Sequence, residues 1–213
     1  MAGYIIYSLD WPGLQNLTSN PRPSQLATMA DAIDEEFEPL CDDLAPDDIA
    51  HSWSLDRETH QKAIQSHLQR DDWYAGLSDD AKSIWHSAFA EACSQIPELL
   101  FRVESDGIYW DVIDIALRHL TAATDAKPAL ATFGTVPFRC GLHQPRAMED
   151  WHPSHSMHSP DETAAIRKEL DSVESEIDSS GNSDALRDYE NELMPSLDRI
   201  VREERMLFVA VNS

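Results

Sequence analysis

The hydrophobic residues of this chain form a short run at each end, and each run is apolar on both of its alternating faces. Residues 3–9 place Tyr4 and Ile6 on one face and three further apolar residues on the other, and residues 206–211 have the same character. A strand that is apolar on both faces is typical of a central position in a covered sheet. We therefore expect both terminal strands to share one sheet, which favours a single domain spanning 1–213.

Between these ends, apolar residues recur at spacings of three and four, which is the pattern of amphipathic helices. The expected helices cover residues 25–37, 57–69, 78–95 and 109–120. Cys93 falls on the apolar stripe of the third of these helices and is expected in the core. Three further expectations are a turn at Asp106-Gly107, a strand within 129–138 and a long loop over 141–158.

The clearest helix start in the sequence lies at Ser159. Serine suits the N-cap, Pro160 suits the first helical position, and Glu162 completes a capping box. A Ser-Gly pair then separates this helix from a second one, which Pro195 should kink or split. The short connection predicts an antiparallel helix hairpin over 159–205.

Together these elements predict an α+β fold. Its small, mostly buried sheet would include both terminal strands and be packed by five to seven helices. The hairpin also offers a surface for a homodimer, so both a monomer and a homodimer are compatible with the sequence.

Charge narrows the class of partner. The chain has 39 acidic and 16 basic residues, and the segment 31–48 contains nine acids and no Lys or Arg. Such a surface repels phosphate backbones and anionic membranes, so we expect neither nucleic-acid nor membrane binding. It favours a basic protein partner. The candidate partner-binding residues in this segment are Asp42, Asp43, Asp47 and Asp48.

The acidity also has an explanation without a partner. Only four of the 16 basic residues are Lys, and Asp outnumbers Glu. An Asp-rich, Lys-poor composition is expected where salt screens self-repulsion. A salty habitat, or solubility alone, would then account for much of the charge, and the segment 31–48 would be a solvated face.

One local cluster has the chemistry of a metal site. Cys140, His143, His152, His155 and His158 lie within 19 residues of the expected loop. Thiolate and imidazole are the ligands that zinc prefers, and a catalytic zinc site would keep one position open beside a base such as Glu149 or Asp150. The alternative is that these are ordinary surface or packing histidines.

No complete catalytic signature is present. Dinucleotide, phosphate-loop, serine-hydrolase and H-E-x-x-H patterns are all missing. We therefore expect no cofactor, and zinc is the alternative that the sequence leaves open. We therefore expect a non-enzymatic binding or inhibitor module of the immunity type. A zinc-binding protein or metal-dependent hydrolase is the alternative.

Three widely spaced cysteines, no signal-peptide pattern and no long apolar stretch predict a soluble protein of the reducing cytoplasm.

Four segments of the chain resemble the uncharacterised bacterial YfbM-like proteins. They are residues 4–14, which read as a strand running into a short helix, residues 110–121, the helix start at Ser159 and residues 207–211. The resemblance covers about a quarter of the chain. It implies a compact α+β domain and no established activity, so it assigns no functional residue.

Overall fold

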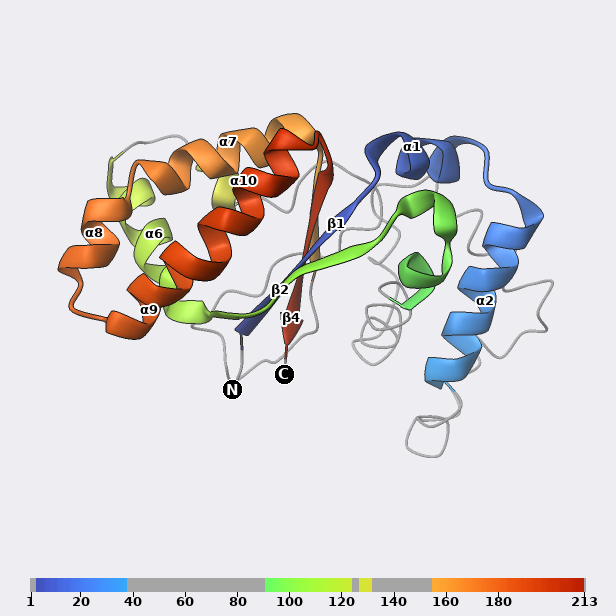
Figure 1. Ribbon diagram of the computed structural model, residues 1–213, viewed down its shortest axis with the longest axis horizontal. Helices are drawn as coiled ribbons and strands as arrows, with labels where there is room; N and C mark the ends of the chain where they lie inside the picture. Colours follow the sequence, from blue (N-terminus) through green and yellow to red (C-terminus); the bar gives the residue numbers. More distant parts are fainter. Residues whose placement is uncertain (1–2, 38–90, 124–126, 132–154, 213) are drawn as a thin grey trace.

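The computed structural model describes residues 3–37, 91–123, 127–131 and 155–212. At the centre of this part lies a four-stranded antiparallel sheet in the order β2-β1-β4-β3 (Figure 1). Its strands are β1 (Gly3–Leu9), β2 (Arg102–Tyr109), β3 (His155–His158) and β4 (Met206–Asn212). The α+β prediction is confirmed, and the two terminal strands occupy the central positions that their two apolar faces indicated.

Seven α-helices accompany the sheet within the described residues. They are α1 (Trp11–Ser19), α2 (Pro23–Phe37), α6 (Trp110–Ala123), α7 (Pro160–Asp171), α8 (Glu174–Ser179), α9 (Ser183–Asp188) and α10 (Met194–Arg202). Short 3₁₀ turns occupy η2 (Pro97–Leu99) and η3 (Ala129–Ala131), and η4 (Tyr189–Leu193) is a π-helical turn. Residues 91–95 are also helical. None of the described helices is long and apolar enough to cross a membrane.

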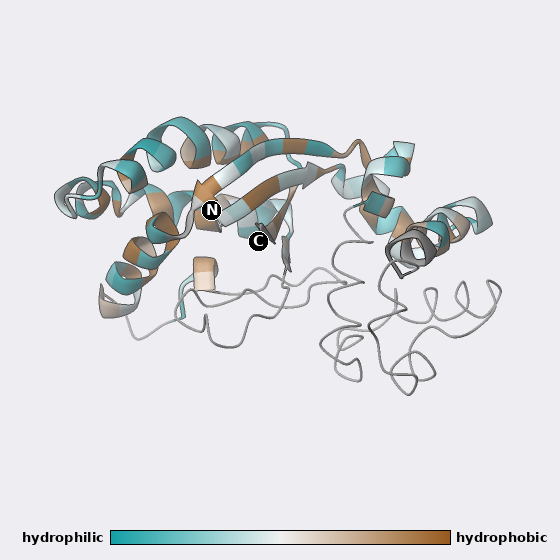
Figure 2. Ribbon diagram, turned by 90° about the horizontal axis from the view of Figure 1, so that it is seen from below, coloured by the Kyte–Doolittle hydropathy of each residue, from teal (hydrophilic) through white to brown (hydrophobic). Residues whose placement is uncertain are grey.

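Helices lie on both sides of the sheet. Figure 1 shows α6 to α10 on one side, and α1 and α2 on the other. Alternate residues of the strands supply two separate cores: Tyr4 and Ile6 of β1 join the first, and Leu9 joins the second. β4 divides in the same way, with Leu207 in the first core and Phe208 in the second. Along the helices, apolar residues recur among polar ones, as expected for helices with one buried face (Figure 2).

The two ends of the chain meet within the sheet. β1 and β4 pair antiparallel over their full length, from Gly3 opposite Asn212 to Leu9 opposite Met206. Gly3 and Asn212, the first and last described residues, therefore lie side by side (Figure 1).

β2 replaces the turn that the sequence predicted at Asp106-Gly107. In its pairing with β1, Ile108 lies opposite Tyr4 and Ser105 lies opposite Ile6. Two residues of β2, Asp106 and Gly107, thus lie opposite the single β1 residue between Tyr4 and Ile6. Two residues facing one is the arrangement of a β-bulge. The Asp-Gly pair marks an irregularity inside a strand, and the prediction of a turn was wrong.

Three other boundaries differ from the predictions. The end of the expected 141–158 loop is strand β3, and residues 129–131 form the turn η3 instead of a strand. The helix from Ser159 ends at Asp171, and α8 follows as a separate helix. The expected helix over 57–69, most of the one over 78–95 and the rest of 129–138 lie outside the described residues.

The helix start predicted at Ser159 is present in the structure. Ser159 Oγ accepts from the Glu162 amide, and Glu162 Oε2 accepts from the Ser159 amide at 2.8 Å, which completes the capping box. α7 and α10 pack against each other (Figure 1). Pro195 splits the second arm: the turn η4 precedes it, and the Met194 amide bonds to the Tyr189 carbonyl. A wider turn at this point accommodates a residue that has no N–H to donate.

Candidate functional site

The sequence-predicted contact and metal residues divide between described and undescribed parts of the chain. Asp42, Asp43, Asp47 and Asp48 lie outside the described residues, as do Cys140, His143 and His152. His155 and His158 lie on β3, where they pair with Ala210 and Leu207 of β4. Sequence reasoning placed both histidines on a loop because the two-sided burial of this short strand depends on β4, which is distant in sequence.

His158 is a core residue. Its side chain is 1% exposed, and its Nε2 lies 2.9 Å from Ser156 Oγ, which is also buried. The other ring nitrogen, Nδ1, is buried without a hydrogen-bond partner. Burial lowers the pKa of His158 to about 4, and the nearby Glu162 carboxylate only partly opposes this effect. The imidazole is therefore neutral at physiological pH.

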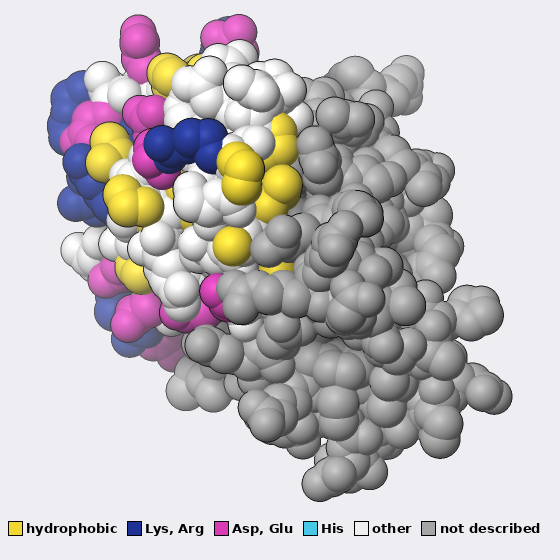
Figure 3. Space-filling model, turned by 90° about the vertical axis from the view of Figure 1, so that its right-hand side faces the viewer, with side chains coloured by type: hydrophobic (Ala, Val, Ile, Leu, Met, Phe, Trp, Pro, Cys, Tyr) yellow, Lys and Arg dark blue, Asp and Glu magenta, His cyan; other side chains and the backbone are white. Residues whose placement is uncertain are grey.

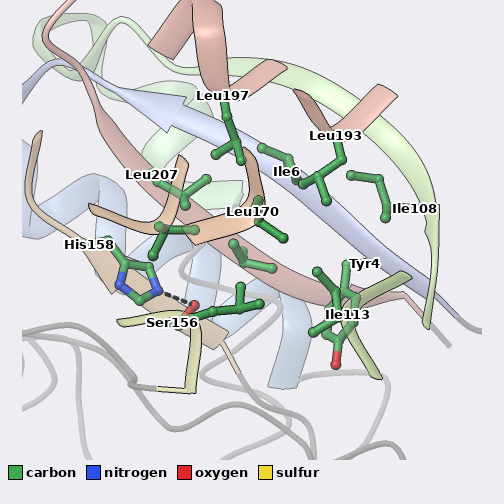
Figure 4. Close-up of a pocket in the computed structure, with 13 residues that line it drawn as sticks. Tyr4, Ile6, Ile108, Ile113, Ser156, His158, Leu170, Leu193, Leu197 and Leu207 are labelled. Carbon is green, nitrogen blue, oxygen red and sulfur yellow. Dashed lines mark hydrogen bonds between the residues drawn. The ribbon is translucent and has the colours of Figure 1, made fainter. Parts of the chain in front are cut away.

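His158 and Ser156 border a small cavity between the sheet and the α6–α10 layer. The cavity has a volume of about 40 Å³, and the rest of its wall is almost entirely apolar, as Figure 4 shows for Ile6, Leu170 and Leu207. This volume admits a water-sized molecule, but a stable buried water needs two to four polar partners. The cavity is therefore suited to a small apolar guest or to remaining empty, and it has no room for a sizeable substrate.

The zinc hypothesis stays a prediction for residues outside the described part. Within the described residues, no group of three or more His, Cys, Asp or Glu side chains is placed to hold a metal ion. His158 would have only Nδ1 to contribute while Nε2 remains bonded to Ser156.

Cys93 fulfils its predicted role as a core residue. It is a free thiol, 1% exposed, and burial raises its pKa. A buried thiol with a raised pKa is a poor nucleophile.

A buried polar network that sequence reasoning missed joins the strand ends near α10. Ser8 Oγ donates to Glu104 Oε1 at 2.6 Å and accepts from Arg205 Nε at 2.8 Å. Arg205 Nη2 also donates to the carbonyls of Ser8 and Leu100. Arg199 Nε lies 2.6 Å from Glu104 Oε2, whose side chain is 3% exposed. The network leaves Ser8 inaccessible, so its role is to join β1, β2, α10 and the turn that precedes β4.

The remaining arginines of the described part are neutralised locally. Their partners are acidic in every case: Arg22–Glu98, Arg102–Glu203, Arg118–Asp114, Arg167–Asp171 and Asp198, Arg187–Asp184 and Asp188, and Arg202–Glu203. On the face in Figure 3, basic side chains lie directly against acidic ones. Because the acids outnumber the bases, the surplus carboxylates set the sign of the surface potential.

Comparison with known proteins gives no relative: no family model, curated protein or solved structure matches this chain. The resemblance to YfbM-like proteins therefore stays a prediction that rests on the four segments named above.

Proposed function

We propose that this protein is a non-enzymatic binding or inhibitor module that recognises a basic protein through its acidic surface. The observation that carries the proposal is the pairing of the arginines. Each arginine of the described part is held by a carboxylate or buried at Ser8, while exposed acids remain in excess. A cationic partner would meet a negative field with little competition from the arginines of the described part.

The acidic segment 31–48 is the expected main contact in this proposal, because its nine acids have no basic neighbour in sequence. Long-range attraction by such a surface acts mainly on the rate of association and weakens as salt screens it.

The proposal is tested by titration with a fluorescent hexa-arginine peptide, followed by anisotropy at about 0.02 and 0.3 M NaCl. The test variant converts Asp42, Asp43, Asp47 and Asp48 to Asn. The matched control removes the same amount of charge from four exposed acids of the described surface, namely Asp106, Glu174, Asp178 and Glu190.

We expect the affinity of the unmodified protein to fall at least about tenfold over this salt range. The test variant should lose clearly more affinity than the control. Affinity that is indifferent to salt would refute the acidic-surface proposal. Equal losses in the two variants would remove segment 31–48 as the main contact.

A further inference from the structure

A groove of about 700 Å³ runs between the starts of α1 and α7 and is closed by the turn that joins α10 to β4. Its apolar wall includes Trp11, Pro12, Pro160 and Val201, and its acidic groups are Asp161 and Glu204. Trp11 packs against the core while remaining partly exposed, so its indole is held in place from behind.

The two carboxylates of this groove are exposed, and within the described part of the chain neither forms an ion pair. The neighbouring cations are already engaged, because Arg202 lies 3.8 Å from Glu203 and Arg205 is bonded to Ser8. The described lining of the groove includes no basic side chain. The groove therefore combines an aromatic wall with negative charge that lacks a counter-charge.

The helix ends around the groove favour a cation on one side. α10 ends at Arg202, and its Ile200 and Val201 carbonyls are already bonded to the Arg205 and Glu204 amides, so this helix end adds only a weak negative potential beside Val201 and Glu204. The start of α7 carries partial positive charge, and the Asp161 carboxylate in the first turn of this helix offsets that charge.

We propose that this groove takes a Lys or Arg side chain of the basic partner, placed against the Trp11 indole and between the Asp161 and Glu204 carboxylates. The inference rests on the proposed function and names one anchor within it. Charge complementarity identifies the occupant: an indole attracts a cation over its face, and two unpaired carboxylates would repel an anionic group.

The experiment uses the hexa-arginine peptide and compares two double variants with equal charge change. The groove variant is Asp161→Asn with Glu204→Gln. The control is Asp178→Asn with Glu190→Gln, on the exposed surface of α8 and η4. Amide NMR spectra of each variant verify that the fold is retained. The Trp11 indole N–H signal, assigned through Trp11→Phe, reports occupation of the groove.

We expect the groove variant to bind the peptide about five- to tenfold more weakly and the control less than about twofold more weakly. The Trp11 signal should shift on titration of the unmodified protein, and Glu204→Gln alone should lose part of the affinity.

The failures of the two proposals are distinguishable. Equal losses in the two variants, or an unmoved Trp11 signal, would overturn the groove and leave salt-dependent binding intact. If the unmodified protein shows no salt-dependent binding, the proposed function fails and the groove fails with it.

Discussion

Gly13 lies where α1 packs against the turn η2. A Cβ atom at this position would lie 2.2 Å from the Glu98 carbonyl oxygen, which belongs to the backbone and cannot rotate away. Helix propensity alone favours alanine over glycine by about 1 kcal/mol. The contact with η2 reverses that preference, so glycine is required here by packing.

We predict that Gly13→Ala destabilises the protein by about 1–3 kcal/mol, as expected for an added carbon that forces a backbone shift. The measurement is the urea unfolding midpoint. Gly107→Ala is the matched control, because a Cβ at Gly107 meets nothing within 4 Å. A stabilised Gly13→Ala variant would show that α1 and η2 separate freely.

His158 should make the free energy of unfolding decrease as pH falls, because burial lowers its pKa. Its pKa is about 4 in the folded protein and 6.5 for an unperturbed histidine. The unfolded chain therefore binds the proton first as pH falls. The stability associated with the neutral ring is fully present above pH 6.5 and is lost between 6.5 and about 4. The loss amounts to at most about 3 kcal/mol.

We expect His158→Leu to flatten the fall in unfolding free energy across this pH range. The comparison is made as a difference from the unmodified protein, because the titration of many carboxylates is common to both. Met157→Leu, at the neighbouring buried position of β3, serves as the control, because it removes no titratable group and should keep the unmodified pH profile. Parallel profiles for His158→Leu and the unmodified protein would contradict the prediction.

At the scale of elements, the junction between α10 and β4 has an unusual residue. The Arg205 amide bonds to the Ile200 carbonyl and the Glu204 amide to the Val201 carbonyl, which together form a Schellman motif. Glu204 has φ 51°, in the left-handed region that glycine usually occupies. Gly181, with φ 73°, shows the usual choice between α8 and α9.

We predict that Glu204→Gly raises the unfolding free energy by up to about 1 kcal/mol, because glycine adopts this conformation without strain. Gly181→Ala should have the opposite effect of similar size. Thermal unfolding measures both. If the groove is a binding site, Glu204→Gly gains stability and loses peptide affinity together, whereas a purely structural Glu204 would leave affinity unchanged.

The elements that the sequence predicted well are those with strong local signals. Ser159, Pro160 and Glu162 define the start of α7 by themselves, and the two-sided apolar pattern locates β1 and β4. β2 has no such pattern, because register shifts interrupt the alternation of its inward and outward residues. Its apolar Val103 is exposed and its polar Ser105 is buried, which is the reverse of what their side chains suggest. β3 has four residues and depends on β4 for its pairing.

At the scale of the whole molecule, net charge opposes compaction. The formal net charge is -23, and folding brings these like charges closer together. The arginine–carboxylate pairs relieve only part of the resulting repulsion. Surface ion pairs contribute little individually, about 0–1 kcal/mol each.

We predict that added NaCl raises the thermal unfolding midpoint between about 0.02 and 0.3 M, because the Debye length falls below the spacing of many surface charges. Calorimetry measures the shift. The variant with Asn at positions 42, 43, 47 and 48 should respond less. A midpoint that falls with salt would mean that attractive pairs outweigh net repulsion, and it would weaken the explanation of the acidity by a salty habitat.

The sequence alone determined the fold class, the central place of the terminal strands, the capped helix start at Ser159 and the excess of acid. Each of these depends on periodicity, local capping or composition, which are properties of neighbouring residues. Only the tertiary structure decided that His158 lies in the core, that Ser8, Glu104 and Arg205 form one network, and that Trp11, Asp161 and Glu204 share a groove. These residues are far apart in sequence, and their proximity depends on how strands and helices pack.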